Sequence, residues 1–171
     1  IPGTGEYALA TTPVFLSTEF GAQAPVNVTT VQGKTDLRVA LDSLNGELPA
    51  CGSVSLVVSW FGNDLRCGHC TVRPRAEQVD HEPAAQVWRV SGVGRAAAGQ
   101  VPLDAGSPVY GGTPSDASVI EAITEIRSRG HEVMFYPFIL MDQMPGNSLR
   151  DPHTGATGQP ALAWRGRITL S

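Results

Sequence analysis

The chain has 171 residues, of which 42% are apolar and 16% are charged, so it is long enough for one domain with a substantial core. Its formal net charge is −4 and its lysines and arginines form no long runs, which argues against binding through a nucleic-acid backbone. The longest apolar stretch, Val54 to Phe61, contains two serines and is too short for a membrane span. The chain opens on Ile1-Pro2 without an initiator Met or a basic leader, and we expect it to be a piece of a longer polypeptide.

Residues 1–33 are rich in Thr, Pro and Gly and are interpreted as an extended lead-in segment. Short apolar patches at 14–16 and 26–28 predict one or two extended stretches within it. After this segment the apolar period changes to that of an amphipathic helix over 34–48, which Pro49 and Gly52 end. The apolar stripe of this helix consists of Leu37, Leu41, Leu44 and Leu48.

The stretch VSLVVSWFG at 54–62 is almost continuously apolar or small. A strand with one solvent-exposed face alternates between apolar and polar residues. This run does not alternate, so it predicts a strand buried on both faces, as in a parallel sheet. Residues 63–107 are interpreted as an excursion from the sheet. Within it, VWRVSGV at 87–93 alternates as a half-exposed strand does.

Residues 108–140 carry the clearest pattern in the chain. PVYGGTP at 108–114 predicts a short strand that ends in glycines, and Thr113 followed by Pro114 predicts the start of a helix. The helix continues over apolar positions three and four apart and ends near Gly130. HEVMFYPFIL at 131–140 predicts a second buried strand. Strand, helix and strand in one parallel sheet form a βαβ unit.

The order of these elements predicts an α/β fold built from parallel βα units. In such folds the functional loops follow the carboxyl ends of the strands. The loop at 141–166 follows the last predicted strand, and Pro145, Pro152 and Pro160 restrict its backbone. We therefore expect an ordered surface there, packed against a neighbouring chain or against further parts of the same fold.

Several blocks of the sequence resemble one known family. They are IPGTGEYALATTPV, VSLVVSWFGNDLRCGHC, PVYGGTPSDASVIEAI and YPFILMDQMPGNSLRDP, together with WRGRITL. These blocks are similar to the large baseplate protein of gene transfer agents, the megatron, which is called the host-specificity protein in related siphophage tails. The resemblance covers essentially the whole chain.

The resemblance implies a fold, a location and partners. In that family these blocks lead into and begin a TIM-barrel-like domain that is similar to glycoside hydrolases. Residues 34–171 would be the N-terminal part of an incomplete TIM-barrel-like domain, since a closed barrel needs eight βα units and about 250 residues. The implied location is the tail tip or baseplate of a virion or phage-like particle, which is an oligomeric assembly. The implied partners are other tail proteins and a host cell-surface glycan or receptor.

No residue is assigned as catalytic. Glycoside hydrolysis uses two carboxylates, and the acids at predicted strand ends, Asp64 and Asp142, are more simply explained as loop residues that cap turns. Aromatic faces that stack on sugar rings and amides that bond hydroxyls suit a glycan-binding groove. The glycan-facing candidates are Trp60, Asn63, Asp64, Asp142, Asn147 and Trp164. Trp60 also suits the core, and Trp164 also suits an anchor for its loop.

The cysteines raise the question of a metal or redox site. Cys67 and Cys70 form a single CxxC pair, whereas a structural zinc needs four ligands. Cys51, His69 and His81 do not complete a standard zinc motif, and the helix that thioredoxin-like chemistry requires does not follow the pair. We expect free thiols or one disulfide, and no bound metal. No glycine-rich segment matches a phosphate loop, so no cofactor is expected.

Three functions fit these patterns. The first is a structural and host-recognition component of a tail tip, acting in adsorption and envelope penetration. The second is a glycoside hydrolase for capsule or cell-wall glycans, with catalytic carboxylates outside this chain. The third is a free-standing α/β enzyme, against which the missing carboxylate pair and cofactor loops argue. The sequence beyond Ser171 separates the first two, because it shows whether strand-end glutamates follow.

Overall fold

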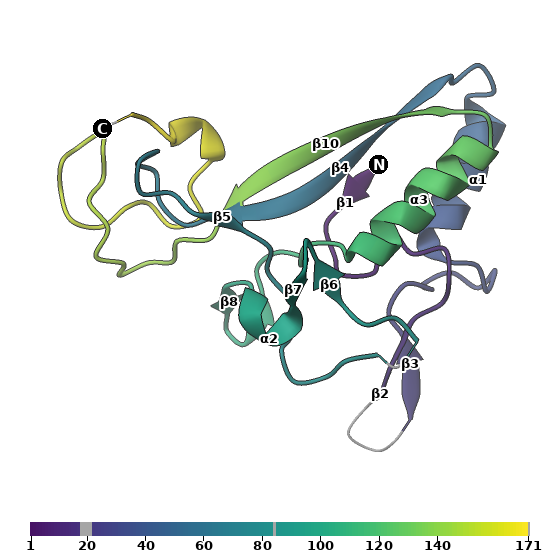
Figure 1. Cartoon of the computed structure of the whole chain (residues 1–171), viewed down its shortest axis with the longest axis horizontal. Coiled ribbons are helices and arrows are strands. Elements are labelled where there is room, and N and C mark those ends of the chain that lie inside the picture. Colours follow the sequence, from purple (N-terminus) through teal and green to yellow (C-terminus); the bar gives the residue numbers. More distant parts are fainter. Residues whose placement is uncertain (18–21, 84, 171) are drawn as a thin grey trace.

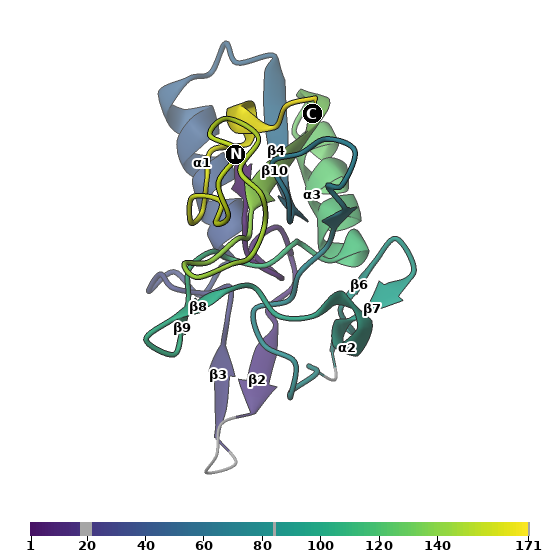
Figure 2. The same cartoon turned by 90° about the vertical axis from the view of Figure 1, so that its left-hand side faces the viewer.

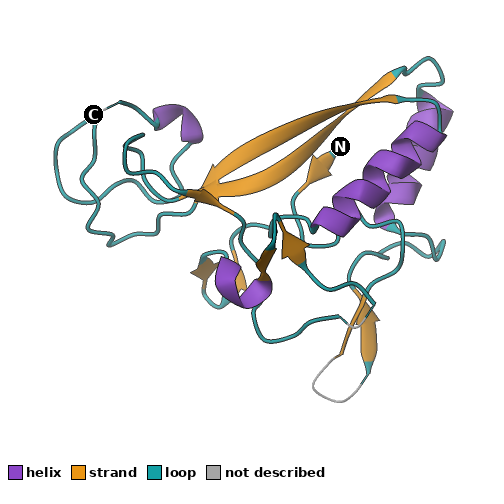
Figure 3. Cartoon of the chain, in the orientation of Figure 1, coloured by secondary structure: helices purple, strands orange, loops and turns teal. Residues whose placement is uncertain are grey.

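A computed structural model describes residues 1–17, 22–83 and 85–170 of the chain. Residues 18–21, 84 and 171 lie outside this description, and with them small parts of the segments expected at 1–33, 63–107 and 34–171. The fold is mixed α/β with a parallel sheet at its centre (Figures 1 and 3). The expected fold class is confirmed at this level.

The sheet has the strand order β1 (Pro2–Gly3), β4 (Ser53–Gly62) and β10 (Glu132–Met141), and these strands are parallel. β5 (Val72–Arg73) pairs antiparallel with the last residues of β4. β4 is therefore the central strand, and β1 and β10 lie on its two sides.

Two helices cover one face of this sheet. α1 (Asp36–Glu47) connects β1 to β4, and α3 (Asp116–Ser128) precedes β10. Both helices pack on the alternate side chains of β4 that point to one face, and apolar burial there stabilises the fold. The buried cluster consists of Leu9, Leu37, Leu41, Val54, Leu56, Val58, Ala122 and Ile126. The predicted leucine stripe is confirmed as far as Leu44, whereas Leu48 lies beyond the helix and is exposed.

The start of α3 differs from the prediction by two residues. Its N-cap is Ser115, whose Oγ accepts a hydrogen bond from the N–H of Ser118 at 3.1 Å. The hydroxyl oxygen of Thr113, the predicted cap, instead accepts the N–H of Arg75 at 3.2 Å. The end of the helix is as predicted, because Gly130 follows it with a φ of 86°, a conformation that favours glycine.

The strand predicted at 108–112 is not in the parallel sheet, so the βαβ prediction for 108–140 is wrong in its first element. Ser107–Pro108 forms β9, which pairs only with β8 (Leu103–Asp104) in a small hairpin. The glycines after it lie against the turn that follows β1, where the N–H of Gly5 donates to the carbonyl of Gly112 at 2.7 Å. The sheet strand that precedes the first helix is β1, at the start of the segment expected as an extended lead-in.

The strand predicted to be buried at 131–140 lies at an edge and is largely exposed. The N–H groups of Glu132 and Asp142 donate to the carbonyls of Gly52, just before β4, and Gly62, at its end. The even-numbered residues of β10 therefore bond β4, and the odd-numbered residues face the other edge. No strand pairs with that edge in the described part of the chain. Pro137 falls at one of its odd positions, where a missing N–H costs no bond to β4.

The prediction that β4 is buried on both faces holds for the second half of the strand only. Val54, Leu56 and Val58 are buried beneath the helices, whereas Ser55 and Val57 on the opposite face are half-buried. From Ser59 onward both faces are covered, except that Trp60 is half-buried. The open part of the second face lies beside β10, which none of the described helices covers on that side.

A second core joins the N-terminal segment to the excursion. Its buried members are Tyr7, Ala10, Val14, Trp88, Val90 and Ala98. The half-exposed strand predicted at 87–93 is a small hairpin of β6 (Arg89–Val90) and β7 (Val93–Gly94), followed by α2 (Arg95–Ala98). The hairpin of β2 (Phe15–Ser17) and β3 (Gln23–Pro25) projects away from the sheet (Figure 2). None of the described helices is long and apolar enough to span a membrane.

Candidate functional site

Two loops meet beyond the carboxyl ends of β4 and β10 (Figure 1). Residues 63–71 follow β4, and residues 142–169 follow β10 and include the short helix η1 (Arg165–Arg167). The N–H of Thr169 donates to the carbonyl of Leu65, and the N–H of Cys67 donates to the carbonyl of Thr169, both at 2.8 Å. The two loops therefore form one ordered unit over a small apolar cluster of Leu65, Met141 and Ala163.

Asp64 is buried at the centre of this unit. Its Oδ2 accepts Arg66 Nη2 at 2.7 Å, and its Oδ1 accepts Arg66 Nε at 3.0 Å and Gln159 Nε2 at 2.8 Å. These hydrogen bonds, first of all those from the Arg66 side chain, hold the pKa of Asp64 well below its usual range. Asp64 is therefore an ionised carboxylate that ties the two loops together.

Gln159 and Asn147 fold the loop at 141–166. Gln159 Oε1 accepts the N–H of Leu65 and Gln143 Nε2, each at 2.9 Å. Asn147 Oδ1 accepts the N–H of Gln159 at 2.9 Å, and its Nδ2 donates to the carbonyls of Met144 and Gln159, each at 2.8 Å. These contacts lie within the chain and agree with the prediction that this loop is ordered. That the loop also packs against another chain stays a prediction.

Asp142 and Asn63 are likewise bonded inside the chain. Asp142 Oδ2 accepts Arg75 Nη2 at 2.7 Å and Nε at 2.9 Å, and this partly buried ion pair fixes the excursion to the end of β10. Asn63 Oδ1 accepts the N–H of Thr71 at 2.7 Å and closes the loop that carries the CxxC pair. Both side chains stabilise turns and loop contacts in this structure.

The two candidate tryptophans lie apart. Trp60 lies on the helix-covered face of β4 and packs against both cores. Trp164 precedes η1 in the ordered loop and is 71% exposed. Beside it, the Arg165 guanidinium lies 3.9 Å from the centre of the Phe138 ring and donates to the Tyr136 hydroxyl at 3.0 Å. The structure thus gathers Asn63, Asp64, Asp142, Asn147 and Trp164 in or beside the two loops and separates Trp60 from them.

The three cysteines, Cys51, Cys67 and Cys70, are free thiols in the structure. Within the described part of the chain, no three His, Cys, Asp or Glu side chains are grouped so that they could hold a metal ion.

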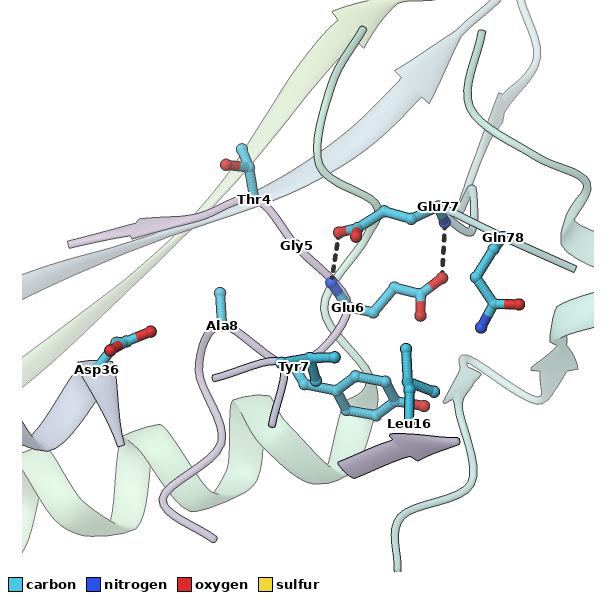
Figure 4. Close-up of a pocket in the computed structure, with 10 residues that line it drawn as sticks. Thr4, Gly5, Glu6, Tyr7, Ala8, Leu16, Asp36, Glu77 and Gln78 are labelled. Carbon is cyan, nitrogen blue, oxygen red and sulfur yellow. Dashed lines mark hydrogen bonds between the residues drawn. The ribbon is translucent and has the colours of Figure 1, made fainter. Parts of the chain in front are cut away.

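A second polar site follows the carboxyl end of β1, where no sequence pattern pointed. Glu6 and Glu77 each accept the other's backbone N–H, with Glu77 Oε1 3.1 Å from the N of Glu6 and Glu6 Oε1 2.6 Å from the N of Glu77 (Figure 4). Glu77 Oε1 also accepts the N–H of Gly112 at 2.9 Å. The hollow beside them has a volume of about 220 Å³. The pair is separated by 71 positions along the chain, so local spacing gives no signal of it.

Arg95 completes this site from behind. Its Nη1 donates to Glu6 Oε1 at 2.5 Å, its Nη2 to the Tyr7 hydroxyl at 3.0 Å and its Nε to Glu82 Oε2 at 3.1 Å. Burial lowers the pKa of Arg95, but the hydrogen bonds that it donates to Glu6 and Glu82 outweigh this effect and raise that pKa overall. Fixed donors therefore occupy the Glu6 carboxylate. The arrangement works as a clasp between the N-terminal segment and the excursion. Burial raises the pKa of Glu6, although its contacts with Arg95 offset part of this rise.

No protein-family model and no curated protein matches this chain.

Proposed function

We propose that this chain is a structural and host-recognition component of the baseplate of a phage-like tail, as its resemblance to the gene transfer agent megatron implies. The observation that carries this proposal is the free edge of β10. On this ten-residue strand Met134, Phe135 and Tyr136 are 56%, 49% and 41% exposed. A long apolar edge of this kind is covered by another segment or chain in a functional assembly, because otherwise it promotes aggregation.

We also propose that the sheet is the first part of a TIM-barrel-like domain. The strand order β1, β4, β10 follows the order of the chain, and both helices lie on the same face. A barrel is built in this way, with each parallel strand added beside the last and the helices outside. The free edge of β10 is then the place where the next strand pairs.

The loops beyond β4 and β10 support glycan recognition more than hydrolysis. A glycosidase needs one carboxyl group whose pKa is raised, so that it can donate a proton. Asp64 and Asp142 are each ion-paired with an arginine, and the pKa of Asp64 is lowered. The exposed Trp164 offers a face for sugar stacking. A hydrolase whose carboxylates lie outside this chain is the alternative, and release of reducing sugar by whole particles detects it.

The test uses particles from cells that express a tagged copy of the chain. We expect the tag to co-sediment with tails and to lie at the tail tip in immuno-electron microscopy. Phe135→Lys, on the exposed edge strand, is expected to abolish incorporation, because a charge there opposes contact with a covering strand or helix. Leu48→Lys is the matched control, since Leu48 is also exposed but follows the carboxyl end of α1 and is not part of the edge strand. Particles that lack the tagged wild-type chain, or that incorporate Phe135→Lys as well as the control, contradict the proposal.

A further inference from the structure

A polar hollow of about 370 Å³ lies between the two loops beyond the sheet. One wall comes from the loop after β4 and the other from the loop after β10. Its lining residues are Arg66, His69, Arg150, Asp151, Pro152 and Gly155. Ligands of α/β folds bind at this end of parallel strands, but none of the six glycan-facing candidates lines the hollow.

Both walls of the hollow are fixed by buried contacts. Arg66 is held by two hydrogen bonds to the buried Asp64. The carbonyl of Arg150 accepts the side-chain amide of the buried Gln159 at 2.9 Å. The N–H of Gly155 donates to the carbonyl of Asp151 at 2.8 Å. The hollow is therefore formed before any ligand arrives, which lowers the entropic cost of binding.

One arginine that lines the hollow has no ion-pair partner among the described residues. Arg66 is paired with Asp64. The Asp151 carboxylate accepts the N–H groups of His153 and Thr154, and Arg167 interacts with it electrostatically. Arg150 is exposed, and its guanidinium has no hydrogen bond or ion pair among the described residues. All five of its N–H donors are thus available to a ligand.

We propose that this hollow binds the carboxylate of an acidic sugar, with Arg150 as the anchoring residue. A planar guanidinium donates two parallel hydrogen bonds to a carboxylate, and a single unpaired arginine suits a monoanion better than a dianionic phosphate. The choice of a sugar as carrier of the carboxylate rests on the proposed glycan-recognition function. The anion site itself rests only on the geometry of the two loops.

The test measures binding of D-glucuronate, glucose and inorganic phosphate to the whole chain by NMR titration at fixed ionic strength. We expect glucuronate to bind, glucose to bind more weakly or not at all, and phosphate to bind no better than glucuronate. Arg150→Gln is expected to weaken glucuronate binding about 10- to 100-fold, the usual effect of losing hydrogen bonds to a charged group. Arg150→Lys keeps the charge but not the planar fork, so its glucuronate affinity is expected to lie between those of Arg150→Gln and the wild-type chain. Arg89→Gln is the matched control, because Arg89 is exposed on β6 and distant from the hollow in the fold.

Equal glucuronate affinity of Arg150→Gln and the wild-type chain overturns the site, and so does the absence of any glucuronate binding. Tighter binding of phosphate than of glucuronate overturns the carboxylate assignment. Circular dichroism of each variant shows that the fold is kept, as expected for an exposed side chain. These outcomes are separable from the proposed function, because incorporation of the chain into particles is measured without any ligand.

Discussion

Replacing Glu6 by Gln tests how much the buried clasp contributes to the stability of this fold. The change keeps the shape of the side chain but removes the negative charge 2.5 Å from the Arg95 guanidinium, and both side chains are only 4% exposed. Breaking a buried ion pair by removing one partner costs roughly 3–5 kcal/mol. Because Glu82 still faces Arg95 and the glutamine oxygen still accepts a hydrogen bond, we expect the free energy of unfolding to fall by about 2–3 kcal/mol.

Urea unfolding followed by tryptophan fluorescence measures this loss, because Trp88 lies beside the clasp with the Arg95 guanidinium 5.6 Å from its ring centre. In a thermal melt the expected decrease in Tm is about 5 to 10 °C for a chain of this size. Glu82→Gln is the control, since Glu82 is more exposed and its loss should cost less. The double variant Glu6→Gln, Arg95→Met should recover part of the loss, because no charge stays buried. A loss below about 0.5 kcal/mol, the usual range of surface substitutions, or a larger effect of Glu82→Gln, refutes this account.

The other predictions concern acid stability, the free edge and the shortest strand. The lowered pKa of Asp64 contributes stability above the ordinary carboxyl value of 3.8, and this contribution is lost as the pH falls further. The Tm values of wild type and Asp64→Asn should therefore converge below about pH 4. For the exposed control Asp104→Asn, the Tm difference from wild type should not change with pH. Pro137→Val adds an N–H to the free edge, and sedimentation should show more self-association with an unchanged circular dichroism spectrum. Gly3→Ala places a Cβ 2.6 Å from a β4 carbonyl and should lower the urea midpoint, whereas Gly46→Ala, with no atom within 4 Å of its Cβ, should raise it.

The elements that the sequence predicted well are those with a strong local pattern. The leucines of α1 repeat at helical spacing, and the valine-rich run of β4 favours a strand within a sheet. α3 was predicted from its apolar positions and from Gly130, although its cap was placed at Thr113. Thr113 and Ser115 are equally good caps by residue type, and only the buried contact of Thr113 with Arg75 decides between them.

The elements that the sequence did not predict depend on contacts that are distant along the chain. β1 has two residues, too few for any periodicity, and it joins the sheet because Gly3 lets its backbone lie against β4. The candidate site likewise depends on contacts between residues that are distant along the chain. Asp64 and Asn147 were identified by residue type and position, but their partner Gln159 lies far along the chain from Asp64. Arg150 belongs to no catalytic or binding motif, and only the folded loops show that its guanidinium lines a hollow without an ion-pair partner among the described residues.

β10 shows how one residue can outweigh a pattern. Its ten residues are mostly apolar, which favours a buried strand, yet Pro137 in its middle cannot donate to a neighbouring strand. In the structure Pro137 faces the unpaired edge, so the strand loses nothing in its ladder with β4. A partner segment can still cover the apolar residues of β10 along this edge. It would form no backbone hydrogen bond at Pro137, which has no N–H to donate. Donors on either side of it, at Phe135 and Ile139, then hold the covering segment, so any partner strand should carry a bulge or a water opposite Pro137.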